Sequence, residues 1–141
     1  MKLAILTAAL AIFLTGLAST ATAADLVLNL STRGAGGRIA VAVYRDAEAF
    51  RRGEGPVASR MVARTGGVTS LTLTGLAPGR YAVAAFHDTD GNGDLTLWPI
   101  GLPREAYGFS NDARGRFGPP DFARAAFDLP AQGATQTFRL H

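Results

Sequence analysis

Apolar and polar residues alternate along most of this chain, which is the pattern of strands that bury one face. The first run covers residues 26–30 and the second covers 39–43, each with an apolar side chain at every second position. A glycine-rich turn at 34–37 separates them. The two runs therefore predict a β-hairpin.

Five further strands follow from alternation and from turn residues. They are predicted at 57–64, 68–73, 81–86, 127–129 and 135–140. The strand at 81–86 is apolar on both faces, which predicts a central position in a sheet. Short helices are expected at 46–50, where Asp46 is placed to cap the first turn, and at 119–126. About seven short strands with one or two short helices predict an all-β protein, an antiparallel β-sandwich with Greek-key connections.

The first 23 residues have the pattern of an export signal. Lys2 precedes an apolar run at 3–17, and Ala21-Thr22-Ala23 supplies the small residues of a cleavage site. We expect cleavage after Ala23, a single mature domain at 24–141 and a periplasmic or secreted protein. After cleavage no long apolar segment is left, so no stable membrane insertion is expected.

Composition excludes some function classes. The 141-residue chain has no cysteine, so neither disulfides nor a lipid-modified cysteine are expected. The formal net charge is +3 at pH 7, but the arginine clusters are too thin for a nucleic-acid-binding stripe. The expected partner is an extracytoplasmic ligand or protein.

The segment after residue 86 carries the most specific chemistry. At 88–118 it is longer than a passive connection of ~12–15 residues. Oxygen donors alternate at Asp88, Asp90, Asn92 and Asp94, a spacing that suits a calcium ion with its ~6–8 oxygen ligands. A backbone carbonyl near Thr96 would add another ligand.

The pattern then departs from the EF-hand calcium loop. That loop ends in a bidentate glutamate eleven residues after its first ligand, and Pro99 stands there in this chain. We take Glu105 as the first candidate for the closing ligand and Asp112 as the second. The alternative is a polar turn without an ion, because Asp, Asn and Gly are also common turn residues.

Other conspicuous side chains have structural interpretations. His87 shares a strand face with Tyr81 and Val83, which predicts a packed or hydrogen-bonded histidine rather than a metal ligand. The aromatic residues of the loop form either a platform that stacks on a sugar or a lid packed over the end of the sheet. They are Trp98, Tyr107, Phe109 and Phe117. We favour the lid, because exposed together they would form a large apolar patch.

Four segments resemble a known family. They cover 75–83 (Gly-Leu-Ala-Pro-Gly-Arg-Tyr-Ala-Val), 87–93 (His-Asp-Thr-Asp-Gly-Asn-Gly), 101–111 and 117–122. The pattern is similar to the small exported bacterial proteins grouped as domain of unknown function 2141. This resemblance implies a single exported β-sandwich without an established activity. The first segment also resembles transthyretin-like and prealbumin-like sandwich modules. Family members often carry a further aspartate near 95–97, which this chain lacks.

Three functional hypotheses remain open. The first is a non-enzymatic structural or ligand-binding module in which a calcium ion orders the 88–112 loop. The second is a saccharide- or peptide-binding protein that uses Trp98, Tyr107 and Phe109. The third is a metal-dependent hydrolase built on His87, Asp88 and Glu105.

Overall fold

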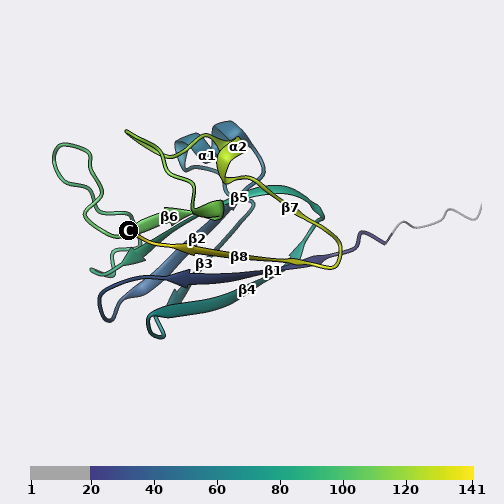
Figure 1. Ribbon diagram of the computed structural model, residues 1–141, viewed down its shortest axis with the longest axis horizontal. Coiled ribbons are helices and arrows are strands. Elements are labelled where there is room, and N and C mark those ends of the chain that lie inside the picture. The colour runs from purple at the N-terminus through teal and green to yellow at the C-terminus, as the bar shows by residue number, and fades with distance from the viewer. Residues whose placement is uncertain (1–19) are drawn as a thin grey trace, which may run out of the picture.

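The computed structural model describes residues 20–141 as two sheets packed face to face (Figure 1). All but residues 20–23 of the predicted signal segment lies outside the described residues. The three-stranded sheet has the order β4-β1-β8, with bounds Val68–Leu76, Ala24–Ser31 and Ala134–Arg139. The other sheet has the order β3-β2-β5-β6, with bounds Ala58–Ala63, Arg38–Tyr44, Gly79–Asp88 and Tyr107–Phe109. The short strand β7, Phe127–Leu129, pairs with the start of β5.

The prediction of a mostly β, sandwich-type fold is confirmed. The central position of the 81–86 strand is confirmed as well, since β5 lies between β2 and β6. One strand pair departs from the antiparallel expectation: β1 and β8 run parallel, with Leu28 opposite Gln136. Among the residues that the structure describes, no helix is long and apolar enough to cross a membrane.

The predicted hairpin of 26–30 with 39–43 is wrong. Strand β1 pairs with β4 and β8, whereas β2 pairs with β3 and β5 in the other sheet. Leu28 of β1 and Val41 of β2 belong to the same buried cluster between the sheets. The turn at 34–37 therefore crosses from one sheet to the other. The apolar faces of β1 and β2 lie opposite each other across the core, whereas the two strands of a hairpin would lie side by side in one sheet.

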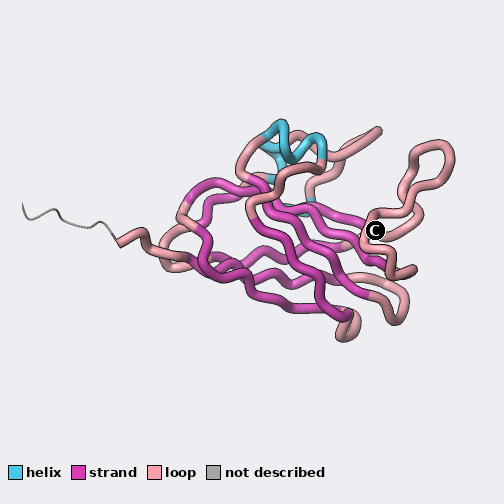
Figure 2. The backbone as a smooth tube through the Cα atoms, turned by 180° about the vertical axis from the view of Figure 1, so that it is seen from behind, coloured by secondary structure: helices cyan, strands magenta, loops and turns pink. Residues whose placement is uncertain are grey.

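A second, smaller core lies on the outer face of the five-stranded sheet. Helices α1, Ala47–Arg52, and α2, Phe122–Ala125, lie over one end of that face (Figure 2). The ring of Phe50 makes edge-on contacts with Tyr44, Phe109 and Phe122 at 5.7–5.9 Å between centroids. The predicted cap is confirmed, since Ala49 N donates to Asp46 Oδ1 at 2.9 Å. Burial raises the pKa of the Tyr44 phenol.

One buried hydroxyl joins β5 to the segment that returns from the long loop. Ser110 opens a 3-10 turn, Ser110–Asp112, and is fully buried. Its Oγ accepts from Val83 N at 2.9 Å and donates to the carbonyl of Ala125. This side chain thus continues the hydrogen bonding of β5 past the end of β6.

We expect Ser110→Ala to destabilise the fold by about 1–3 kcal/mol, because the Val83 amide would lose its partner in a buried place. Urea denaturation of both proteins measures the difference. The control is Ser70→Ala, an exposed hydroxyl that should cost less than about 0.5 kcal/mol. Equal effects of the two substitutions would contradict this role for Ser110.

Candidate functional site

The site begins with a carboxylate that is buried at the end of β5. Asp88 has no exposed surface. Its Oδ1 accepts from Gly91 N at 2.8 Å, and its Oδ2 accepts from Gly93 N at 3.1 Å and from Arg38 Nη2 at 3.2 Å. Both glycines have φ in the left-handed region, which turns their amides toward the carboxylate. The Asp88 side chain therefore folds the loop around itself.

A second buried carboxylate closes the same loop. Glu105, 7% exposed, accepts from Thr89 N at 2.8 Å through Oε1 and from Thr96 N at 3.0 Å through Oε2. Thr89 and Thr96 lie on opposite sides of the Asn92 turn. Glu105 thus holds the two arms of the loop together from a position near β6.

The third carboxylate lies at the surface. Asp90 Oδ2 accepts from Thr96 Oγ1 at 2.8 Å, and its Oδ1 accepts from Asn92 N at 3.1 Å. The hydrogen bond from the Thr96 hydroxyl, with that from the Asn92 amide, holds the pKa of Asp90 below its ordinary value. These hydrogen bonds therefore favour the charged form of the Asp90 carboxyl.

These three side chains converge. One oxygen each from Asp88, Asp90 and Glu105 lies within 4.8 Å of the others. Arg38 reaches Asp88 as an ion pair at 3.2 Å, so one guanidinium contacts a group of three carboxylates. Converging carboxylates are the ligands that hard cations such as calcium prefer, and this triad could hold a metal ion.

The other predicted ligands lie outside the triad. The Asn92 amide oxygen accepts from Asp94 N at 2.9 Å, and the Thr96 carbonyl accepts from Arg104 N at 2.8 Å. The side chain of Asp94 is exposed. Asp112, the second candidate for a closing ligand, accepts from Arg139 N at 3.1 Å instead. Of the two closing candidates, Glu105 is the one that joins Asp88 and Asp90.

His87 is buried as predicted, at 2% exposure, and its Nε2 lies 2.7 Å from the Gly36 carbonyl oxygen. The adjacent Gly37 has φ +72°, and a Cβ there would lie 2.6 Å from the Asp88 carbonyl oxygen. The 34–37 turn therefore packs directly on the end of β5. Sequence reasoning missed the roles of Gly37 and Arg38, which become visible only once β2 is paired with β5 in register.

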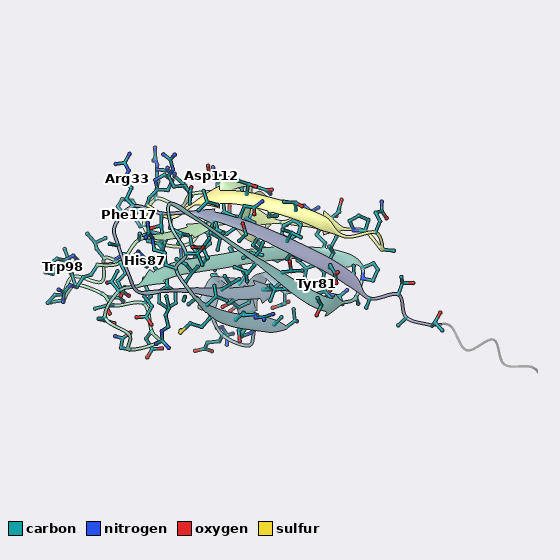
Figure 3. All side chains as sticks on the ribbon, turned by 90° about the horizontal axis from the view of Figure 1, so that it is seen from below. Arg33, Tyr81, His87, Trp98, Asp112 and Phe117 are labelled. Carbon is teal, nitrogen blue, oxygen red and sulfur yellow. The ribbon has the colours of Figure 1, made fainter. Side chains whose placement is uncertain are left out.

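The aromatic residues divide into two groups. Tyr107 and Phe109 are half-buried, and Phe109 packs on Phe50 at 5.7 Å between ring centroids. They form the edge strand β6 of the sheet, paired with β5, rather than the predicted lid folded over the end of the sheet. Trp98 and Phe117 do not join them. They are 52% and 100% exposed and lie on separate loops at one end of the molecule (Figure 3). The expected lid of four aromatics is wrong for these two as well, because each lies at a loop tip beyond the reach of the sheet.

A groove of about 560 Å³ lies on the outer face of the five-stranded sheet beside this loop. Its floor consists of the small outward side chains of Ala40, Ala42 and Ala84. Its borders come from β3, β5, β6, the end of α1 and the loop, and include Met61, Phe86, Tyr107, Phe109, Tyr44, Gly53, Asp94 and Leu95. Gly93 and Asp94 belong to the groove as well as to the acidic loop, so the two features adjoin.

Comparison with protein families gives one match. The family described as an uncharacterized protein conserved in bacteria, DUF2141, matches residues 30–137. The chain belongs to this family, as the sequence resemblance implied. Neither the comparison with curated proteins nor the comparison with solved structures found a match.

Proposed function

We propose that this protein is an exported, non-catalytic β-sandwich module that binds a ligand, and that a divalent cation, calcium first, orders its 88–105 loop. One observation carries the cation part of the proposal: oxygens of Asp88, Asp90 and Glu105 lie within 4.8 Å of one another, and two of these carboxylates are buried. Export is supported by the apolar run at 3–17 followed by Ala21-Thr22-Ala23.

The charge balance of the triad favours a cation. Burying a carboxylate is costly unless it is paired or hydrogen-bonded. Backbone amides and Arg38 satisfy part of this need at Asp88, while Glu105 is bound by amides and has no ion pair with any of the described residues 20–141. A divalent ion would add two positive charges where three negative ones meet. Calcium suits such an irregular oxygen set better than magnesium, which demands octahedral geometry.

The contacts of His87, Asp88 and Glu105 favour structural roles over the hydrolase hypothesis. His87 contacts the Gly36 carbonyl, and Asp88 and Glu105 hold loop amides. Each of the three side chains thus has a partner that builds the loop. We propose structural roles for all three.

The groove supports a second candidate function, the binding of a small apolar molecule. Outward positions of an exposed antiparallel sheet are normally polar, yet the groove positions on β2 and β5 are mostly alanines together with Phe86, and Ser59 of β3 is the polar exception among the outward positions that line the groove. Its volume falls in the range of about 300–1,000 Å³ that is typical of small-molecule sites. The floor has no hydrogen-bonding side chain, which favours an apolar body over a saccharide.

Calcium should raise the melting temperature by several degrees, because a ligand present at a hundredfold excess over its Kd stabilises the native state by about 2.7 kcal/mol. Asp90→Ala should abolish this increase, whereas Asp94→Ala, outside the triad, should keep it. Differential scanning fluorimetry with calcium, magnesium and chelator measures the shift. An unchanged melting curve at millimolar calcium would contradict the cation proposal.

The groove is tested with 1-anilinonaphthalene-8-sulfonate, a planar apolar molecule with one anionic group. Isothermal titration calorimetry should show one site per chain. Ala84→Glu, which puts a charge on the groove floor, should remove that site. Phe117→Ala is the control, since this exposed ring lies outside the groove and its loss should leave the titration unchanged. Binding that survives Ala84→Glu would refute the groove as the site.

Export predicts a defined mature N-terminus. N-terminal sequencing of the protein recovered from outside the cytoplasm should read Ala24-Asp25-Leu26, because the small residues at 21 and 23 direct cleavage after Ala23. A mature protein that still begins at Met1 would contradict the proposal.

A further inference from the structure

The loop between Asp94 and Glu105 presents its apolar side chains to solvent. We call residues 96–104 the loop hairpin. Its large apolar side chains are about half exposed or more: Leu97 at 51%, Trp98 at 52%, Ile100 at 79% and Leu102 at 55%. None of them belongs to either buried cluster. Core packing therefore does not explain why these residues are apolar.

The loop hairpin has its own hydrogen bonds, and these hold its tip in one shape. Trp98 N donates to the Leu102 carbonyl at 2.7 Å, and Gly101 N donates to the Trp98 carbonyl at 2.8 Å. At the base, Arg104 N donates to the Thr96 carbonyl at 2.8 Å, next to the Glu105 anchor. A partner would meet an apolar tip that is already ordered, which lowers the entropic cost of binding.

A second apolar tip lies at the same end of the molecule. Phe117, fully exposed, belongs to the loop that follows the 3-10 turn, and Trp98 and Phe117 lie at the same end of the molecule (Figure 3). The loop hairpin projects outward from the sheets at this end (Figure 1). Two protruding tips suit a broad apolar surface rather than a small molecule, which would need a concave site.

Arginines accompany both tips. The guanidinium of Arg104 lies 4.5 Å from the centroid of the Trp98 ring. Arg114 and Arg116 precede Phe117 in the chain and are exposed, and Arg33 lies at the same end (Figure 3). Guanidinium groups beside tryptophan and aliphatic side chains match the boundary of a bilayer, where phosphates adjoin the apolar layer. Three carboxylates would repel lipid phosphates: Asp90 and Asp94 near the base of the loop hairpin, and Asp112 near the second loop.

We propose that this end of the protein docks reversibly on a bilayer that contains anionic phospholipids. The tip of the loop hairpin and Phe117 enter the interfacial layer, and the arginines contact lipid phosphates. The proposed contact is limited to the bilayer surface and does not cross the bilayer. Its calcium dependence rests on the proposed function, because a cation at Asp90 would remove the repulsion between the hairpin base and the anionic surface.

Trp98 is the only tryptophan of the chain, so its fluorescence reports on the hairpin tip alone. We expect its emission to move to shorter wavelength when the protein meets vesicles of phosphatidylcholine with phosphatidylglycerol, and to move less with phosphatidylcholine alone. High salt should weaken the effect. A shift that needs calcium supports both proposals, and a shift that occurs in chelator as well supports docking without its cation dependence.

Matched variants identify the contact in vesicle cosedimentation. Ile100→Ser with Leu102→Ser should lower the partition coefficient about tenfold, equivalent to about 1.4 kcal/mol. Phe117→Ser should lower it to a smaller extent. Val57→Ser is the control, since Val57 is 51% exposed and adjoins Val43, at the opposite end of β2 from Arg38.

Three results would overturn the proposal. One is an unchanged Trp98 emission with anionic vesicles in calcium. Another is equal sedimentation of the double variant and the Val57→Ser control. The third is self-association in the absence of lipid that the double variant abolishes, which would assign the hairpin to contact between copies of this chain. The calcium-dependent melting shift is measured without lipid, so failure of docking and failure of the cation proposal remain distinguishable.

Discussion

The loop that follows β5 depends on one buried carboxylate, that of Asp88. It accepts hydrogen bonds from Gly91, Gly93 and Arg38 at 2.8–3.2 Å, and it does so at the last position of the central strand β5. A buried carboxylate without these donors would be strongly unfavourable. Burial of the charge and the fold of the loop are therefore coupled, and neither is expected without the other.

The same loop connects three features that would otherwise be unrelated. Its two ends supply the acidic triad, the segment 93–95 borders the groove, and the loop hairpin carries the exposed apolar tip. Glu105 joins the first and last of these by binding amides on both arms. A change in the order of this loop would thus reach both the groove and the hairpin.

Local patterns predicted most of the fold. Alternation located the described strands except β6, which lies in the segment 88–118 that was predicted as a loop. An apolar pattern on both faces placed β5 centrally, because one face meets the core and the other meets α1, α2 and the groove floor. The hairpin of β1 with β2 was wrong, since alternation shows that a face is buried but not which sheet contains the strand. Spacing singled out Asp88 and Asp90, and Glu105 was a candidate closing ligand because Pro99 stands where the spacing expects a glutamate. Arg38 and Gly37 required the strand register. Trp98 and Phe117 were misplaced because composition does not distinguish a packed aromatic from one at a loop tip.

The central claim is that the 88–105 loop is a folded unit anchored by carboxylates and completed by a cation. Amide hydrogen exchange followed by NMR tests it most directly. The account predicts that the amides of Gly91, Gly93 and Thr96 are protected and that calcium slows their exchange further, while the Val83 amide within β5 is unaffected. Rapid exchange of the loop amides at the same rate with calcium and with chelator would contradict it.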